Sequence, residues 1–477
     1  MAQVDYRNKP EQATRTPTKA DSRAWMRAWW FRLLVLLLFV ELIWPFLLWQ
    51  AGLKQRLDFT KEIVAGVIVG LTLVFMLLKN RLPGGMLLIL AITIVWTLVA
   101  MFEGQAASVT LWGWWRLFKY PILALFIYLM SRWPPDSARL IFKFLAYTLA
   151  FEVVVQLGQF AAGQPPGDSL AGTFGNKGVG PYSMFVFFVV CIGLGHWLAT
   201  GEWKSVALIL GLGLVATMLS VTKFYVFAIA VLLVFALIVH LVRGGRFRHL
   251  FLYAAVALLA GAIFVPVYNN FIATTRGLKP LQAYLTRGAI EGYLFTEKES
   301  DQDGLYKLGR GGAVVYAWQQ IQRDRTTTLF GYGMGSRSYS STLGIEGATL
   351  EDDLYGGGGN TSMGVWIQEY GLVGAALFLA MNFWIMAKLL RFARRTSDPY
   401  EATLAYGLII FTFFWPLWLW YHKVWLFGVA MICYWVTLGF VFQQIYLRPQ
   451  RVAQRPQPAW AQDESVPAFF RPPRPRR

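Results

Sequence analysis

The polar stretch from residue 268 to residue 362, together with the residues that follow it, carries the side chains best suited to chemistry. Arg310 stands where a helical pattern begins, and both a guanidinium and the amino end of a helix bind phosphate oxygens well. Glu369 and His422 are residue types that accept a proton or a hydrogen bond from an attacking hydroxyl. These residue types predict a site that binds phosphate and accepts a proton or a hydrogen bond.

The composition indicates that a membrane protein positions these side chains. The chain has 477 residues, of which 56% are hydrophobic and 15% are charged, and this balance is too apolar for a soluble enzyme. The net charge of +18 could indicate nucleic-acid binding, but the basic residues lie in short loops and tails between apolar runs. The positive-inside rule requires such placement. We therefore expect a bilayer protein that binds no nucleic acid.

A transmembrane helix needs about 20 apolar residues to cross roughly 30 Å of hydrocarbon, and about twelve stretches of the chain meet this requirement. They are residues 29–50, 62–79, 86–102, 114–131, 138–162, 179–200, 205–222, 225–242, 249–268, 363–388, 403–421 and 424–446. The sequence thus predicts an all-α integral membrane protein with about twelve transmembrane helices and one large, partly helical periplasmic loop between the ninth and the tenth.

The predicted helices divide the chain into successive parts. Residues 1–28 form a basic cytoplasmic tail, 29–268 nine helices, 269–362 the large loop, 363–446 three helices, and 447–477 a disordered cytoplasmic tail. Basic residues concentrate in the tails and in alternate loops, so both termini are expected in the cytoplasm and the large loop outside. Cys191 and Cys433 fall in predicted helices and no zinc pattern occurs, so no disulfide, metal or cofactor is expected.

Short motifs follow one another along the chain in a distinctive order. They are Gly172-Thr-Phe-Gly-Asn-Lys177, Thr217-Met-Leu-Ser-Val-Thr-Lys223, Arg310 with Trp318 and Phe330-Gly-Tyr-Gly-Met-Gly-Ser336, and Asn360 with Glu369-Tyr-Gly-Leu-Val-Gly374. With this order and a large external loop after the ninth span, the chain resembles the O-antigen ligase and Wzy-type polymerase family of bacterial inner-membrane glycosyltransferases. The resemblance covers residues 60 to 440 in layout, and its specific motifs cover far less.

The resemblance implies an enzyme that transfers a glycan from an undecaprenyl-pyrophosphate carrier to an acceptor sugar hydroxyl, without a metal or a nucleotide sugar. The acceptor is another lipid-linked repeat unit in polymerases and lipid A core in ligases. Ligases carry a His near the start of the tenth span, where this chain has Gly359-Asn360. A polymerase-type member is therefore favoured, and a chain-length regulator is a further expected partner.

The resemblance also implies that Lys223 and Arg310 hold the pyrophosphate. Many relatives have Arg at the position of Lys223. The ammonium group of lysine is a point charge and lacks the two parallel donors of a guanidinium. Snorkelling of Lys223 to the membrane surface is the alternative interpretation. Further candidates for the pyrophosphate are Arg323, Arg325, Arg337 and Lys177, and those for the sugar are Asp352, Asp353 and Asn360. Lys177, Arg116 and Lys119 are interpreted chiefly as anchors at the membrane surface.

The candidate catalytic residues also have structural interpretations. Glu369 is the first candidate for the catalytic base and His422 the second, although His422 could instead belong to an aromatic belt. Glu152, deep in a predicted helix, is expected to have a structural partner. The glycine-rich turn from Gly331 to Gly335 is interpreted as tight packing of the loop rather than as a phosphate cradle.

A secondary transporter with twelve helices is the alternative from another class. The basic turn from Lys79 to Gly85 resembles one in the major facilitator group, but it lacks that group's Asp and its second basic cluster. The large loop after the ninth span also counts against a transporter. A non-catalytic membrane scaffold would leave the order of the motifs unexplained.

Overall fold

The computed structural model describes most of the chain. The described residues are 28–50, 59–78, 83–130, 133–134, 136–167, 169–175, 178–220, 223–242, 255, 262, 265–266, 268–274, 280–284, 286–295, 298–299, 306–340, 343–347, 361–422, 424 and 428–453. Lys177, Asp352, Asp353 and Asn360 lie outside these ranges, and Lys223 is described by its backbone alone.

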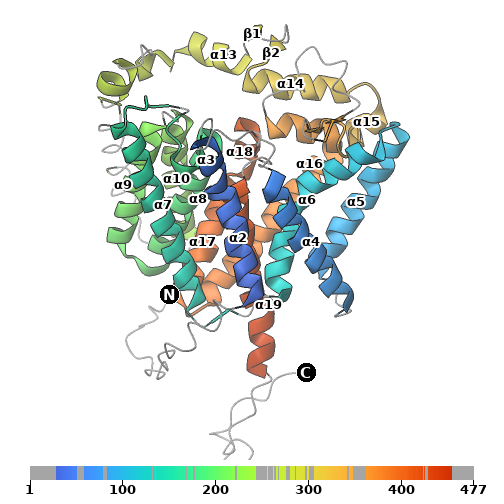
Figure 1. The fold of residues 1–477 in the computed structure, drawn as a ribbon, viewed down its shortest axis with the longest axis horizontal. Helices are drawn as coiled ribbons and strands as arrows, with labels where there is room; N and C mark the ends of the chain where they lie inside the picture. The colour runs from blue at the N-terminus through green and yellow to red at the C-terminus, as the bar shows by residue number, and fades with distance from the viewer. Residues whose placement is uncertain are drawn as a thin grey trace, which may run out of the picture.

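Helices make up nearly all of the described structure, and the long ones stand side by side as a bundle (Figure 1). The bundle contains α2 (Trp29–Leu42), α3 (Trp44–Gln50), α4 (Thr60–Leu78), α5 (Gly84–Phe102), α6 (Ala107–Met130), α7 (Ser137–Ala161), α8 (Val179–Thr200), α9 (Trp203–Leu219), α10 (Lys223–Val242), α16 (Ser362–Arg395), α17 (Pro399–Phe413), α18 (Trp415–Tyr421) and α19 (Gly428–Ala453).

Shorter elements from the predicted large loop lie across one end of the bundle, and we call this layer the cap (Figure 1). Its helices are α13 (Arg287–Phe295), α14 (Arg310–Ile321) and α15 (Arg325–Phe330). Two antiparallel pairs of two-residue strands accompany them: β1 (Lys298–Glu299) with β2 (Tyr306–Lys307), and β3 (Tyr339–Ser340) with β4 (Ile345–Glu346). Single turns of other helix types are η4 (Gly172–Phe174), η5 (Tyr268–Ala273) and η6 (Leu281–Tyr284).

The helices have the apolar character expected of an all-α membrane protein, but the predicted count of twelve spans is not shown. Among the described residues, six helices are long and apolar enough to cross a membrane: α4, α5, α7, α8, α16 and residues 428–446 of α19. A seventh span results if α17 and α18, which meet at a bend of 46°, count as one. The first predicted span is broken between α2 and α3, next to Pro45, and α9 is only 17 residues long. The predicted span 249–268 lies largely outside the described residues.

Helix α8 lies at the centre of the bundle, and its side chains from Tyr182 to Leu198 are buried. It packs closely on α17, since a Cβ atom placed on Gly195 would lie 2.4 Å from the backbone nitrogen of Gly407. Small residues at such positions let two membrane helices approach each other closely. Peripheral helices such as α5 instead expose apolar side chains, with Phe102 89% exposed, as helices that face lipid do.

Candidate active site

The glycine turn, which we define as residues 331–338, joins the cap to the bundle. It is buried where α5, α6 and α16 meet. The backbone N–H of Tyr332 donates to the Gln368 carbonyl at 2.8 Å, and the Tyr332 carbonyl accepts from Gln105 Nε2 at 2.6 Å. Just before the turn, the Phe330 carbonyl accepts from Trp96 Nε1 at 2.9 Å. The interpretation of this turn as a packing element is confirmed.

The glycines in this region are required by backbone conformation and by close approach. Gly335 has φ of 91°, and a Cβ atom there would lie 2.3 Å from the Val109 carbonyl oxygen. Gly371, with φ of 60°, interrupts the helical geometry of α16, and its Cβ would lie 2.5 Å from the Leu329 carbonyl oxygen. L-residues rarely adopt such conformations, so the spacing of these glycines follows from the junction they form.

Glu369 and Arg337, two of the predicted site residues, meet at the glycine turn. Glu369 Oε1 accepts from the backbone N–H of Arg337 at 3.1 Å, and the Ser338 hydroxyl lies 3.5 Å from the same oxygen. The Arg337 side chain points elsewhere, with Nε donating to Gln368 Oε1 at 2.8 Å. The Glu369 side chain is buried, and it serves as the counter-charge and acceptor that organises the turn. These contacts give it a positioning role, and its role as a base stays a prediction.

Arg116, from α6, completes this cluster. Its Nη1 donates to the Ser338 hydroxyl at 2.9 Å, and its charge acts on Glu369. A small pocket lies between α6 and α16, with Arg116 and Leu117 on one side and Trp366, Glu369 and Tyr370 on the other. The interpretation of Arg116 as a surface anchor is therefore wrong. An arginine in a Trp-rich helix was the only sequence signal for its true surroundings.

Arg310 and His422 form a second cluster, although 111 residues separate Arg310 from its nearest partner, Tyr421. Arg310 begins α14, and its Nε donates to the Tyr421 carbonyl at 2.8 Å. The guanidinium also lies 4.2 Å from the centre of the Tyr421 ring. The position is favourable because the carboxyl end of a helix, here α18, attracts positive charge.

His422 ends α18 and connects it to the start of α16. Its N–H donates to the Trp418 carbonyl at 3.0 Å, and its carbonyl accepts from the Ser362 N–H at 2.9 Å. Its ring stacks on Trp418 at 6.0 Å. Burial, and after it the nearby charge of Arg310, lowers the pKa of His422 to about 3. The imidazole is therefore neutral near pH 7, where it is a weak base and a ready hydrogen-bond acceptor.

One face of α16 joins the two clusters. Ser362, Trp366 and Glu369 are spaced i, i+4 and i+7, which places their side chains on the same side of a helix. Seven residues of helix span roughly 10 Å. The cluster at His422 and the cluster at Glu369 therefore lie about two helical turns apart along a single surface.

The remaining predicted residues lie apart from both clusters or outside the described residues. Arg323 and Arg325 are exposed at the corner between α14 and α15, which fits solvated surface residues. Lys223 begins α10.

Two other charged groups have structural partners. Lys119 is buried and forms an ion pair with Glu62 at 2.8 Å, so its interpretation as an anchor is wrong. Glu152, as expected, has a structural partner, since it accepts from the N–H and the hydroxyl of Thr173 at 2.8 and 2.6 Å. These two hydrogen bonds attach the motif that begins at Gly172 to α7.

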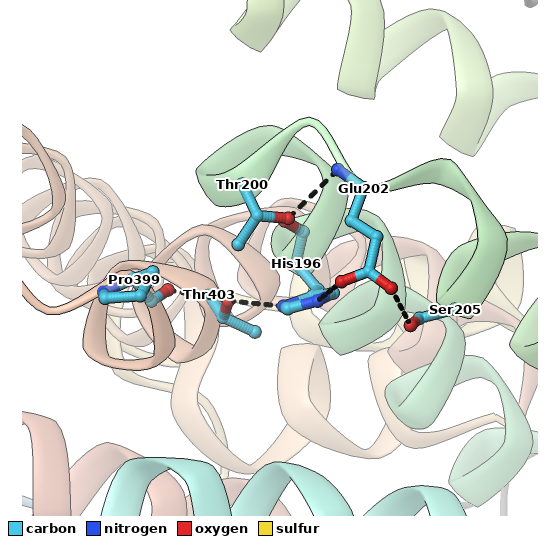
Figure 2. A network of polar contacts seen from close by, with 6 residues as sticks. All are labelled: His196, Thr200, Glu202, Ser205, Pro399 and Thr403. Atoms are coloured by element: carbon cyan, nitrogen blue, oxygen red, sulfur yellow. Dashed lines mark hydrogen bonds and ion pairs between the residues drawn. The ribbon is translucent and has the colours of Figure 1, made fainter. Parts of the chain in front are cut away.

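A polar network at the carboxyl end of α8 is separate from these clusters (Figure 2). His196 Nδ1 lies 3.1 Å from Thr403 Oγ1, and Nε2 lies 3.4 Å from Glu202 Oε2. The imidazole stacks on Phe142 at 4.6 Å. These contacts tie α8 to α17 and to the residue before α9.

No family model matches the chain, and no curated protein matches it either. The assignment of a function therefore rests on the order of the motifs and on the two clusters beside α16.

Proposed function

We propose that the protein is a membrane glycosyltransferase that uses an undecaprenyl-pyrophosphate-linked glycan as donor and an acceptor sugar hydroxyl as nucleophile. In this proposal it polymerises repeat units of a surface polysaccharide in the bacterial inner membrane. The chain crosses the membrane about twelve times, with both termini in the cytoplasm and the cap in the periplasm. The start of α2 and the end of α19 lie at the end of the bundle opposite the cap, in keeping with this topology (Figure 1).

The proximity of Arg310 to His422 is the observation that carries the proposal. Loss of pyrophosphate concentrates negative charge, and a cation held rigidly where that charge develops lowers the barrier. The guanidinium of Arg310 is held by the Tyr421 carbonyl and ring, so little side-chain freedom is lost when it binds phosphate. Lys223, at the start of α10, is proposed as the second contact to the pyrophosphate, as the resemblance implies.

The neutral imidazole of His422 supports a role for this residue at the acceptor. A weak base accepts a hydrogen bond from the attacking hydroxyl and orients it without removing the proton beforehand. Glu369 then contributes to catalysis indirectly, because it holds the glycine turn against α16. Lys177, Asp352, Asp353 and Asn360 remain predicted substrate contacts that lie outside the described residues.

Complementation of a deletion strain tests the proposal. The deletion strain would receive wild type, Arg310→Ala, Lys223→Ala, or the control Arg287→Gln, which removes an exposed charge from the cap. Polymerase activity predicts long glycan chains with wild type and the control, and single repeats on the acceptor with Arg310→Ala. Long chains left on the lipid carrier would indicate a ligase. Glycans that are unchanged by the deletion would contradict both, and transport assays in proteoliposomes would then test the transporter alternative.

A further inference from the structure

The polar network around His196 lies at the end of the bundle that is away from the cap. Helix α16 runs from Ser362, next to the cap, to Arg395, and α17 begins just beyond it at Pro399 (Figure 1). The network joins this beginning of α17 to the end of α8 and to the residue before α9 (Figure 2). The imidazole itself is buried, but Glu202 is 54% exposed, so protons can reach the pair from solvent.

The hydrogen-bond donors of the network assign a proton to each ring nitrogen of His196. The Thr403 hydroxyl donates its one hydrogen to the Pro399 carbonyl at 2.8 Å, so its oxygen is left to accept from His196 Nδ1 at 3.1 Å. Nε2 lies 3.4 Å from Glu202 Oε2, and a carboxylate has no hydrogen to donate. A neutral imidazole carries one N–H and can satisfy only one of these two acceptors. Both contacts are therefore satisfied only by the imidazolium.

The surroundings of Glu202 keep its carboxylate charged. The Ser205 hydroxyl donates to Oε1 at 2.9 Å. This bond, and after it the contact with His196, lowers the pKa of Glu202. The carboxylate is therefore an acceptor near pH 7, and a ring nitrogen without a proton would face it with a lone pair. Loss of the proton from Nε2 thus replaces an attraction with a repulsion.

The other charged groups nearby do not supply an alternative partner for the imidazole. The elements packed around it carry Arg139 and Lys143 on α7, Asp398 and Glu401 on α17, and Glu202 and Lys204 at the start of α9. Among these described groups, Glu202 alone bonds to the imidazole. The Arg139 guanidinium lies 5.8 Å from the centre of the Tyr400 ring, and the charge of Lys204 acts on Glu202. The ring of Tyr400 in turn lies 5.6 Å from that of His196, and an aromatic face next to it favours a cation.

The network adjoins a very close contact between α8 and α17. A Cβ atom placed on Gly195, the neighbour of His196, would lie 2.4 Å from the Gly407 nitrogen and 2.4 Å from the Thr403 carbonyl oxygen. Thr403 and Gly407 are about one turn apart on α17. The bond from Nδ1 therefore holds the two helices at the level where their backbones approach each other.

We infer that His196 and Glu202 form a proton-dependent clamp at this end of the bundle. In the protonated state the imidazolium holds Thr403 of α17 through Nδ1 and the corner between α8 and α9 through Nε2. When the proton on Nε2 is lost, the bond to Thr403 remains and the corner at Glu202 is released. The clamp is independent of the proposed function. In the proposed topology it faces the cytoplasm, whose pH lies close to the range in which histidine titrates.

Thermal unfolding of the purified full-length protein in phosphatidylcholine nanodiscs, from about pH 6 to about pH 8.5 at constant ionic strength, tests the clamp. For wild type we expect the unfolding temperature to fall as the pH rises, because the folded protein holds a proton that the unfolded chain releases. In Glu202→Gln the amide can donate to a neutral Nε2, so the contact no longer requires the proton. Its unfolding temperature should fall by about 2–4 °C less than that of wild type over this range.

Two comparisons show whether the effect belongs to the clamp. Glu291→Gln removes the same charge from an exposed ion pair with Arg287 and should keep the wild-type slope. The chain has 4 histidines, and those other than His196 are present in all these variants, so their contributions cancel. Hydrogen exchange at the amide of Glu202, corrected for the intrinsic effect of pH, gives the local measurement. Its protection should decrease with rising pH in wild type and change less in Glu202→Gln.

Three outcomes would overturn the clamp. Parallel curves for wild type and Glu202→Gln would show that the contact does not depend on a proton. An unfolding temperature that rises with pH in wild type, relative to Glu202→Gln, would show that the neutral imidazole is the form that the fold prefers. A slope in Glu291→Gln as flat as that in Glu202→Gln would mean that the loss of any acidic side chain produces the effect. None of these measurements requires glycan transfer, so failure of the proposed function would leave them unchanged.

Discussion

The Nε atom of Arg310 donates to the Tyr421 carbonyl at 2.8 Å, and its guanidinium lies over the ring of the same residue. A cap residue is thereby attached to the carboxyl end of α18. The contact is made at the carboxyl end of α18, the end away from the 46° bend between α17 and α18. The bend sets the direction in which α18 leads to this contact.

Replacement of Arg310 tests this feature through activity. Arg310→Ala should lower the transfer rate about 100-fold to 1,000-fold, the range seen when one charge-stabilising donor is removed from an active site. The transfer rate of Arg310→Lys should lie between those of wild type and Arg310→Ala, because lysine keeps the charge but lacks the forked donors. The measurement is glycan transfer from lipid-linked donor in isolated membranes. A wild-type rate for Arg310→Ala would rule out its role at the leaving group.

The pKa of His422 predicts an acid sensitivity of the fold. Burial, and then Arg310, lowers this pKa from 6.5 to about 3 in the folded protein. Between these values the unfolded chain binds a proton that the folded chain does not, so stability falls as the pH drops from 6.5 to about 3. His422→Gln should show a flatter dependence when unfolding temperatures are measured from about pH 7 to about pH 4. Parallel curves for the two proteins would contradict the prediction.

Glu369→Gln separates a positioning role from a catalytic one. The amide retains an acceptor for the Arg337 N–H but loses the charge that faces Arg116, so unfolding should become easier by about 1–3 kcal/mol. Transfer should decline in step with stability. Thermal unfolding and transfer rate are measured on the same preparation. Full stability with complete loss of transfer would instead support Glu369 as the base.

Alanine substitutions separate strain from steric overlap in the glycine turn. Gly335→Ala combines a φ of 91° with a Cβ atom 2.3 Å from the Val109 carbonyl oxygen. Gly344→Ala has a φ of 62° but nothing within 4 Å, so it is the matched control for backbone strain of about 1–3 kcal/mol. Gly335→Ala should be destabilising by clearly more than the control in thermal unfolding. Equal effects would mean that the junction adjusts to the added atom.

The ion pair between Lys119 and Glu62 predicts a non-additive response. Lys119→Met alone leaves the half-buried Glu62 carboxylate without its counter-charge and should cost about 1–3 kcal/mol. Adding Glu62→Gln removes that charge while an amide oxygen can still accept from Trp115 Nε1. The double variant should therefore recover most of the stability. Additive losses in unfolding measurements would show that the two side chains are not coupled.

Hydropathy predicted the uninterrupted helices well and the interrupted ones poorly. The predicted spans 86–102 and 179–200 closely match Gly84–Phe102 and Val179–Thr200. A window of about 20 residues averages over a local break, so it missed the breaks beside Pro45 and between α17 and α18. The same averaging explains why hydropathy did not predict the non-helical backbone at Gly371.

The candidate site was predicted residue by residue but not as an arrangement. Arg310, His422, Glu369 and Arg337 were all chosen from their types and motifs, yet their division into two clusters depends on contacts between distant segments. Arg116 was misinterpreted because a single arginine in an apolar helix looks the same whether it faces headgroups or a buried carboxylate. Only the position of Ser338, 222 residues away, distinguishes the two.

The attachments of the glycine turn have a consequence for biosynthesis. The turn is bonded to Gln105, which precedes it in the chain, and to Gln368 and Glu369, which follow it. A ribosome makes the first partner long before the cap and the others only afterwards. The glycine turn therefore cannot complete these contacts until the residues of α16 have been synthesised.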